Sequence, residues 1–177
     1  MKRRIAMRLL ATLPLAVSSQ RASAASQAEV LARAEFIDEH NAAHRLSELT
    51  SPLLLVNLWA AWCAGCLTEL PTLRVLQADL GPRAIDVILL SHGMNWPGDL
   101  AYARDARLPF RHWRLSARTT ETDVAAAFGM EGDRFGLPRT LVFAGETRRL
   151  VASHLGSRDW SDPEQLRLAR GWLRSAG

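Results

Sequence analysis

The sequence predicts a single α/β domain in which parallel strands come first and an antiparallel hairpin follows. A strand, a helix and a second strand succeed one another within about 40 residues, which is typical of a right-handed βαβ unit with parallel strands. Two later strands are separated only by a tight turn, so they pair in antiparallel fashion. The length of 177 residues suits one domain and is too short for two ordinary ones.

The βαβ unit spans the middle of the chain. Residues 53–60 form a nearly continuous apolar run, as expected for a strand that is covered on both faces. A helix should follow from about Cys63 to Leu80, with a kink at Pro71. Residues 85–90 then form a second buried strand.

The second half of the chain contains shorter elements. We expect helices at 98–107 and 120–129, a short edge strand at 110–115 and hairpin strands at 140–143 and 148–154. Asp162 and Pro163 should open the last helix, because aspartate is a good N-cap and proline suits the first helical position. We therefore expect a sheet with helices on both faces.

The positive charge of the chain lies in its first 24 residues. They contain five basic residues and no acidic one, whereas residues 25–177 retain 17 of the 22 basic side chains and all 18 acidic ones, a net charge of −1. Such a balance does not favour nucleic-acid binding. A basic start, an apolar stretch at 9–17 and Ala22-Ser23-Ala24 are typical of a secretory signal peptide.

We therefore expect residues 1–24 to be a signal peptide and residues 25–177 to be one exported domain. The alternative is an uncleaved leader that tethers the protein to the inner membrane. The nine apolar residues would span about 14 Å as a helix, far less than a ~30 Å hydrocarbon core.

The two cysteines, Cys63 and Cys66, lie three positions apart. Their ring is too small to stabilise an exported domain by loop closure, and a structural zinc site would need more ligands. Cys63 falls where a buried strand gives way to a helix, and unpaired N–H groups and the helix dipole stabilise a thiolate there. The spacing predicts thiol–disulfide exchange with Cys63 as the exposed nucleophile and Cys66 as the buried resolving thiol.

Residues 56–66 read VNLWAAWCAGC, and Glu69-Leu70-Pro71 follows. Further matching motifs are Phe128-Gly129, Gly136-Leu137-Pro138-Arg139-Thr140, Gly156 and Trp160. Together these motifs resemble the TlpA/ResA/DsbE group of exported thiol–disulfide oxidoreductases over most of residues 35–175. The resemblance implies a thioredoxin-like fold, a central mixed sheet flanked by helices. It also implies an N-terminal β-hairpin at 36–49, where local propensity alone favours a helix.

The resemblance also implies roles for several residues around the cysteines, in addition to Trp62 directly before Cys63. Pro138 would be a cis-proline beside the active site, where the Leu137 backbone pairs with a bound peptide as an added strand. Asn57 stands where thioredoxins proper carry a buried acid. Glu69 matches a glutamate near the cysteines that relays protons or tunes them, and the alternative is an ordinary solvated acid on the helix surface.

Two departures from the group concern the redox potential and the choice of partner. Gly65 replaces the proline that usually precedes the second cysteine, and residues 131–135 lengthen the loop before Pro138. His92 follows the second strand at the same sheet edge as Cys63, either as a modulator of the thiolate or as a plain loop histidine, which we favour. A hairpin that turns near His40 also argues against a metal site made with His44.

The resemblance implies a dedicated reductant in the bacterial periplasm that acts in cytochrome c maturation or in the assembly of another exported metalloprotein. Its partners would be exported protein thiols and disulfides, such as apocytochrome c, and a membrane electron donor of the DsbD/CcdA type. We expect a monomer with no cofactor or metal beyond the Cys63–Cys66 pair. The alternative is a Sco-like copper chaperone on the same fold, although that family uses CxxxC with a remote histidine.

Overall fold

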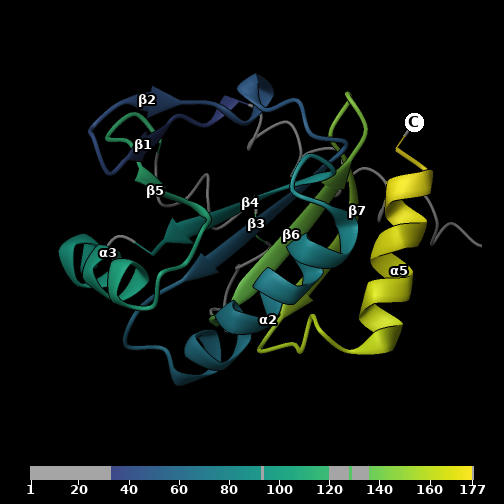
Figure 1. The fold of residues 1–177 in the computed structure, drawn as a ribbon. Helices are drawn as coiled ribbons and strands as arrows, with labels where there is room; N and C mark the ends of the chain where they lie inside the picture. Colours follow the sequence, from purple (N-terminus) through teal and green to yellow (C-terminus); the bar gives the residue numbers. More distant parts are fainter. Residues whose placement is uncertain (1–32, 93, 120–127, 129–135, 177) are drawn as a thin grey trace, which may run out of the picture.

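The computed structural model describes residues 33–92, 94–119, 128 and 136–176. A seven-stranded sheet in the order β2-β1-β5-β4-β3-β6-β7 forms the centre of this part of the chain (Figure 1). Its strands are β1 (Phe36–Asp38), β2 (Ala43–His44), β3 (Leu53–Trp59), β4 (Ile85–Ser91), β5 (Arg111–Leu115), β6 (Arg139–Ala144) and β7 (Arg149–Leu155). Its helices are α2 (Ala64–Leu80), α3 (Trp96–Asp105), α5 (Pro163–Arg174) and the short 3-10 helix η1 (Leu46–Glu48).

The central strand β3 is the most buried of the sheet, and all seven of its residues are buried. It pairs in parallel with β4 and in antiparallel fashion with β6. Its apolar run is nearly continuous because both faces are covered, as a strand between two packed layers requires. The predicted βαβ unit, the C-terminal hairpin of β6 and β7 and the mixed character of the sheet are confirmed.

Alternate residues of β3 face two separate apolar cores. On one face Leu53, Leu55 and Trp59 pack with residues of α2, α3 and α5. On the other face Leu54, Val56 and Leu58 pack with the N-terminal hairpin, η1 and Phe128. The view in Figure 1 shows α2 crossing the sheet and α5 alongside β7.

The two longest helices begin at side-chain caps. Cys63 caps α2, which runs through Pro71 without interruption. Asp162 caps α5 by accepting hydrogen bonds from the N–H groups of Glu164 and Gln165, as its sequence predicts.

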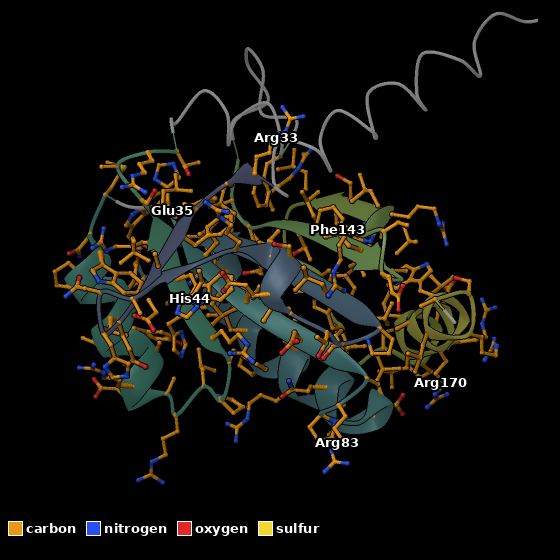
Figure 2. All side chains as sticks on the ribbon, turned by 90° about the horizontal axis from the view of Figure 1, so that it is seen from above. Arg33, Glu35, His44, Arg83, Phe143 and Arg170 are labelled. Carbon is orange, nitrogen blue, oxygen red and sulfur yellow. A yellow bond between two sulfur atoms is a disulfide. The ribbon has the colours of Figure 1, made fainter. Side chains whose placement is uncertain are left out.

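The Arg170 side chain of α5 pairs with Asp79 of α2, and Figure 2 shows Arg170 at the periphery of the molecule. Helix-to-helix contact is therefore apolar inside and ionic at the rim.

The N-terminal hairpin is confirmed and overrides the helical propensity of its sequence. β1 and β2 pair with Phe36 opposite His44, and Asn41 in the turn has φ of +63°. β1 also pairs with β5, where Phe36 stacks on Trp113 with ring centroids 5.6 Å apart. The prediction that β5 is an edge strand is wrong, because the hairpin covers that edge.

Helix α3 begins at Trp96, two residues before the predicted start. Asn95 caps it by accepting a hydrogen bond from the Gly98 N–H at 3.3 Å, and Pro97 occupies the first turn. The predicted leader at 1–24 and loop at 131–135 lie outside the described residues. So does the predicted helix at 120–129, except for Phe128.

Candidate active site

The ends of three strands, β3, β4 and β6, lie together at one edge of the sheet. β3 and β4 are parallel, and Trp59 at the end of β3 pairs with Ser91 at the end of β4. β6 is antiparallel to β3, so its first residue, Arg139, lies at the same edge opposite Leu58. The residues just beyond these ends therefore gather there.

Cys63 and Cys66 are joined by a disulfide at this edge. Cys63 is the N-cap of α2, and its Sγ accepts a hydrogen bond from the Cys66 N–H at 3.1 Å. Both the helix dipole and this N–H group would stabilise a thiolate at Cys63 after reduction. The position of the sulfur therefore favours Cys63 as the nucleophile.

The two cysteines differ in exposure, although less than the sequence suggested. Cys63 is 8% exposed and Cys66 is fully buried. The expectation of an openly exposed nucleophile is too strong, because Cys63 belongs to the apolar core on the α2 face of the sheet. Of the two sulfur-bearing residues, Cys63 is still the one that retains contact with solvent.

Pro138 lies directly beside the cysteine motif. The Leu137–Pro138 peptide bond is cis, as the resemblance implied. A methyl group placed on Gly65 would lie 3.6 Å from Pro138 Cδ and 3.5 Å from Ser157 Cβ. The space between Gly65 and Pro138 is therefore wide enough for a methyl group in ordinary van der Waals contact.

Glu69 is the buried acid of the site. It lies on α2 at 1% exposure, and its Oε1 accepts a hydrogen bond from the Trp160 indole N–H at 2.5 Å. The Thr140 hydroxyl also donates to Oε1 and the Asn57 amide donates to Oε2, both at 3.4 Å. The alternative of a solvated surface acid is wrong, since the helix turns this side chain toward the sheet.

Burial raises the pKa of Glu69 to about 7, and the hydrogen bonds from Trp160, Asn57 and Thr140 oppose the shift. A carboxyl group with this pKa can gain or lose a proton near neutral pH. Asn57 is fully buried, and its amide also donates to the Thr140 hydroxyl at 2.8 Å. Asn57 therefore lies within hydrogen-bonding distance of the Glu69 carboxyl group.

Sequence reasoning did not assign Thr140 or the Trp160 hydrogen bond to the site. Thr140 pairs with Asn57 across two strands that are 83 residues apart in the chain. Trp160 reaches Glu69 from the loop before α5, 91 residues away. Only the register of β3 and β6 could have pointed to Thr140, and no local signal points to the indole.

Trp62 and His92 lie at the outer rim of the site. Trp62 is 59% exposed, and its ring meets the His92 ring edge-on with centroids 6.2 Å apart. The His92 N–H donates to the Trp59 carbonyl at 2.9 Å, which extends the pairing of β3 and β4 by one step. Trp62 therefore offers an apolar surface next to Cys63.

Among the described residues there is no group of three or more histidine, cysteine or acidic side chains that could hold a metal ion. His44 instead pairs with Asp38 at 3.0 Å and stacks on Trp113. Within the same residues no helix is both long and apolar enough to cross a membrane.

Comparison with known proteins points to one class. No family model matches the sequence. The thiol:disulfide interchange protein HelX of Rhodobacter capsulatus is 33% identical over 99 residues, which are 55% of this chain and 49% of HelX. The chain thus spans about half the length of the curated relative it matches.

Solved structures agree on the fold. The thioredoxin domain of a thiol-disulfide oxidoreductase from Bacteroides vulgatus has a TM-score of 0.65 at 16% identity, covering 81% of this chain and 95% of that one. A thioredoxin-related protein from Neisseria meningitidis has a TM-score of 0.61 at 20% identity over 77% and 99%. A thiol:disulfide interchange protein from Chlorobium tepidum has a TM-score of 0.60 at 17% identity over 78% and 92%.

The fold is therefore thioredoxin-like, as the resemblance implied. HelX and the Bacteroides and Chlorobium neighbours are named as thiol–disulfide oxidoreductases or interchange proteins, and these names agree with the resemblance to the TlpA/ResA/DsbE group.

Proposed function

We propose that this protein is a periplasmic thiol–disulfide oxidoreductase that reduces the disulfides of exported partner proteins. The observation that carries the proposal is the Cys63–Cys66 disulfide at the start of α2, directly beside the cis-proline Pro138. A nucleophilic sulfur at a helix N-terminus suits thiol–disulfide exchange, and the resemblance assigns the Leu137 backbone beside it to pairing with an extended peptide. The name of the relative HelX supports the same chemistry.

The first step is attack by the reduced Cys63 thiolate on one sulfur of the partner disulfide. A new bond forms between Cys63 Sγ and that sulfur, the partner disulfide bond breaks, and the other partner sulfur leaves as a thiolate and takes a proton. The Leu137 backbone holds the partner segment as an added strand during this exchange. The Cys66 N–H stabilises Cys63 Sγ as the attacking thiolate.

The second step is attack by Cys66 on Cys63 Sγ. Cys66 loses its proton, the Cys63–Cys66 disulfide forms, and the second partner sulfur leaves as a thiolate that is then protonated. In sum, two electrons pass from the protein dithiol to the partner disulfide. Glu69, with a pKa of about 7, accepts the Cys66 proton in the buried interior.

A reductant in the periplasm needs a source of electrons. The periplasm is oxidising, so a reductant there must be recharged, and we assign that task to a membrane electron donor of the DsbD/CcdA type. The partners we propose are apocytochrome c haem-attachment cysteines or the thiols of another exported metalloprotein during assembly. The resemblance to the TlpA/ResA/DsbE group supports this choice of partner class.

Two experiments test the proposal. Purified protein should accelerate the reduction of insulin by dithiothreitol, and Cys63→Ser should abolish that acceleration, because the first step needs this sulfur. In the native host, Cys66→Ala should accumulate a mixed disulfide at Cys63 with an apocytochrome c or a metal-site assembly protein, since the second step is blocked.

Two other experimental results would contradict parts of the proposal. Capture of many unrelated exported proteins would favour a general isomerase or oxidase. Stoichiometric Cu(I) that survives dialysis and depends on a histidine would favour a copper chaperone instead.

A further inference from the structure

The chain holds a second buried carboxylate that the proposed chemistry does not use. Asp99 lies in the first turn of α3 and is 1% exposed. A buried acid needs hydrogen-bond donors around it, because an unpaired charge in the interior is costly. The identity of its donors shows what Asp99 holds in place.

Both oxygens of Asp99 accept hydrogen bonds from the active-site edge of the sheet. Oδ1 accepts from the Ala61 N–H at 2.6 Å, and Oδ2 accepts from the Ser91 hydroxyl. Ala61 lies in the loop between β3 and α2, two residues before Cys63, and Ser91 is the last residue of β4. The carboxylate therefore joins three elements at one point.

The loop that Asp99 contacts leads directly to the redox sulfur. The Cys63 N–H donates to the Ala60 carbonyl at 3.1 Å, which closes a tight turn over residues 60–63. The Ala61 N–H lies in this turn and is bonded to a carboxylate, and hydrogen bonds to charged groups are the stronger kind. Fixing this peptide fixes the turn and hence the place where Cys63 meets the Cys66 N–H.

We propose that Asp99 is a positioning residue for the redox site, which clamps the Ala61 peptide to α3 and β4 and thereby orients Trp62 and Cys63. The reactivity of Cys63 then depends on a helix that contributes no group to the chemistry itself. This inference rests on the proposed function for its biological meaning, but the geometry it predicts can be measured on Cys63 directly.

The test is a set of variants in the full-length protein. Asp99→Ala removes both acceptors, so the rate of Cys63 alkylation by iodoacetamide at neutral pH should fall about threefold to tenfold, as expected when a thiolate loses its aligned N–H group. The reduction potential of the Cys63–Cys66 couple, measured against glutathione, should become more negative, because the reduced form loses stabilisation. Asp105→Ala, at the exposed end of α3, is the matched control and should change neither value.

The conservative variant separates positioning from general stability. In Asp99→Asn the amide oxygen can accept from Ala61 and the amide N–H can donate to the Ser91 hydroxyl, so both links persist and alkylation should return to within about twofold of the wild type. Ser91→Ala keeps the Ala61 bond and should give an intermediate loss. If Asp99→Ala does not fold, the Ser91→Ala and Asp99→Asn proteins decide the matter.

The inference would be overturned if folded Asp99→Ala had the alkylation rate and the reduction potential of the wild type. If Asp99→Ala does not fold, the same result in Ser91→Ala would overturn it. Failure of the wild-type protein to reduce insulin would instead contradict the proposed function. The two failures are distinguishable, because alkylation and potential are read on Cys63 without any partner protein.

Discussion

At the scale of single residues, Glu69 couples the stability of the fold to pH. Burial raises its pKa from the ordinary 4.5 to about 7. A carboxyl group whose pKa rises on folding binds its proton more tightly in the folded state. Its contribution to stability is therefore complete below about pH 4.5 and is lost as the pH rises through about 7. The shift corresponds to about 3 kcal/mol.

We expect Glu69→Gln to remove this dependence, since the amide is neutral at every pH. In the oxidised protein, the free energy of unfolding in urea of the wild type, relative to that of Glu69→Gln, should fall between about pH 5 and about pH 8. The two proteins are compared at each pH because burial lowers the pKa values of His112 and His154, which make stability depend on pH equally in both. Glu146→Gln, an exposed change of the same kind, should follow the wild type. Parallel curves for wild type and Glu69→Gln would contradict the assigned burial effect.

Gly65 is a residue whose replacement should stabilise the protein. It lies within the first turn of α2, and a methyl group there would meet Pro138 Cδ and Ser157 Cβ at ordinary contact distances of 3.6 and 3.5 Å. Gly65→Ala should therefore raise the free energy of unfolding by about 0.5–1 kcal/mol, because alanine costs less backbone entropy in a helix.

The matched control is Gly81→Ala at the other end of the same helix. Gly81 has φ of +94°, which side chains disfavour, so this change should lower the free energy of unfolding by about 1 kcal/mol although no atom lies within 4 Å of the added methyl. Urea unfolding measures both variants. Destabilisation by Gly65→Ala would show that the CxxC turn tolerates no added atom beside the cis-proline.

At the scale of elements, the N-terminal hairpin depends on one aspartate in its turn. Asp38 Oδ1 accepts from the N–H groups of His40 and Ala42, each at 2.8 Å, and Oδ2 pairs with His44. Burial tends to raise the pKa of Asp38, but its hydrogen bonds with His44, Ala42 and His40 outweigh burial and lower it. The ionised side chain therefore holds β1 and β2 together at neutral pH.

We expect Asp38→Ala to lower the free energy of unfolding by about 1–2 kcal/mol, since two turn N–H groups and the His44 contact lose their acceptor. Glu39→Ala removes only the exposed ion pair with Arg104 and should cost less than about 1 kcal/mol. Equal effects in urea unfolding would show that the turn needs no side-chain acceptor.

At the scale of the whole molecule, we expect the N-terminal hairpin to be essential to the stability of the domain. Phe36 is fully buried against Trp113 and β1 covers the edge of β5. A protein that starts at Ala25 should unfold at the same urea concentration as the full-length chain. In a protein that starts at Glu39, the free energy of unfolding should be lower by about 3–5 kcal/mol, which is typical of deleting a buried aromatic side chain. Equal stability of the two shortened proteins would contradict this expectation.

Much of the architecture follows from local sequence. The apolar run of β3, the cap and proline that open α5, and the tight turn between β6 and β7 are signals within a few residues of the elements they define. The CxxC motif after a buried strand likewise places Cys63 at a helix N-terminus. These predictions hold because strand burial, capping and turn formation are short-range effects.

Predictions from local sequence were wrong where pairing with a distant segment determines the backbone structure. Helix α3 starts at Trp96 rather than at residue 98 because Asn95 caps it, a local signal, whereas β5 is an inner strand only because a hairpin more than 70 residues earlier pairs with it. Helical propensity at 36–49 gives way for the same reason, since pairing with β5 and burial of Phe36 outweigh a weak local preference.

The sequence by itself determined the fold class and the prediction that Cys63 and Cys66 act in that order in the proposed exchange. Only the tertiary structure decided that Glu69 is buried with a hydrogen bond from Trp160, that Asn57 and Thr140 also donate to it, and that Asp99 accepts a hydrogen bond from the Ala61 N–H. The physical reason is that a side chain's burial and hydrogen-bond partners depend on which strands and helices lie beside it. Those neighbours are set by sheet order and register, which join residues tens of positions apart.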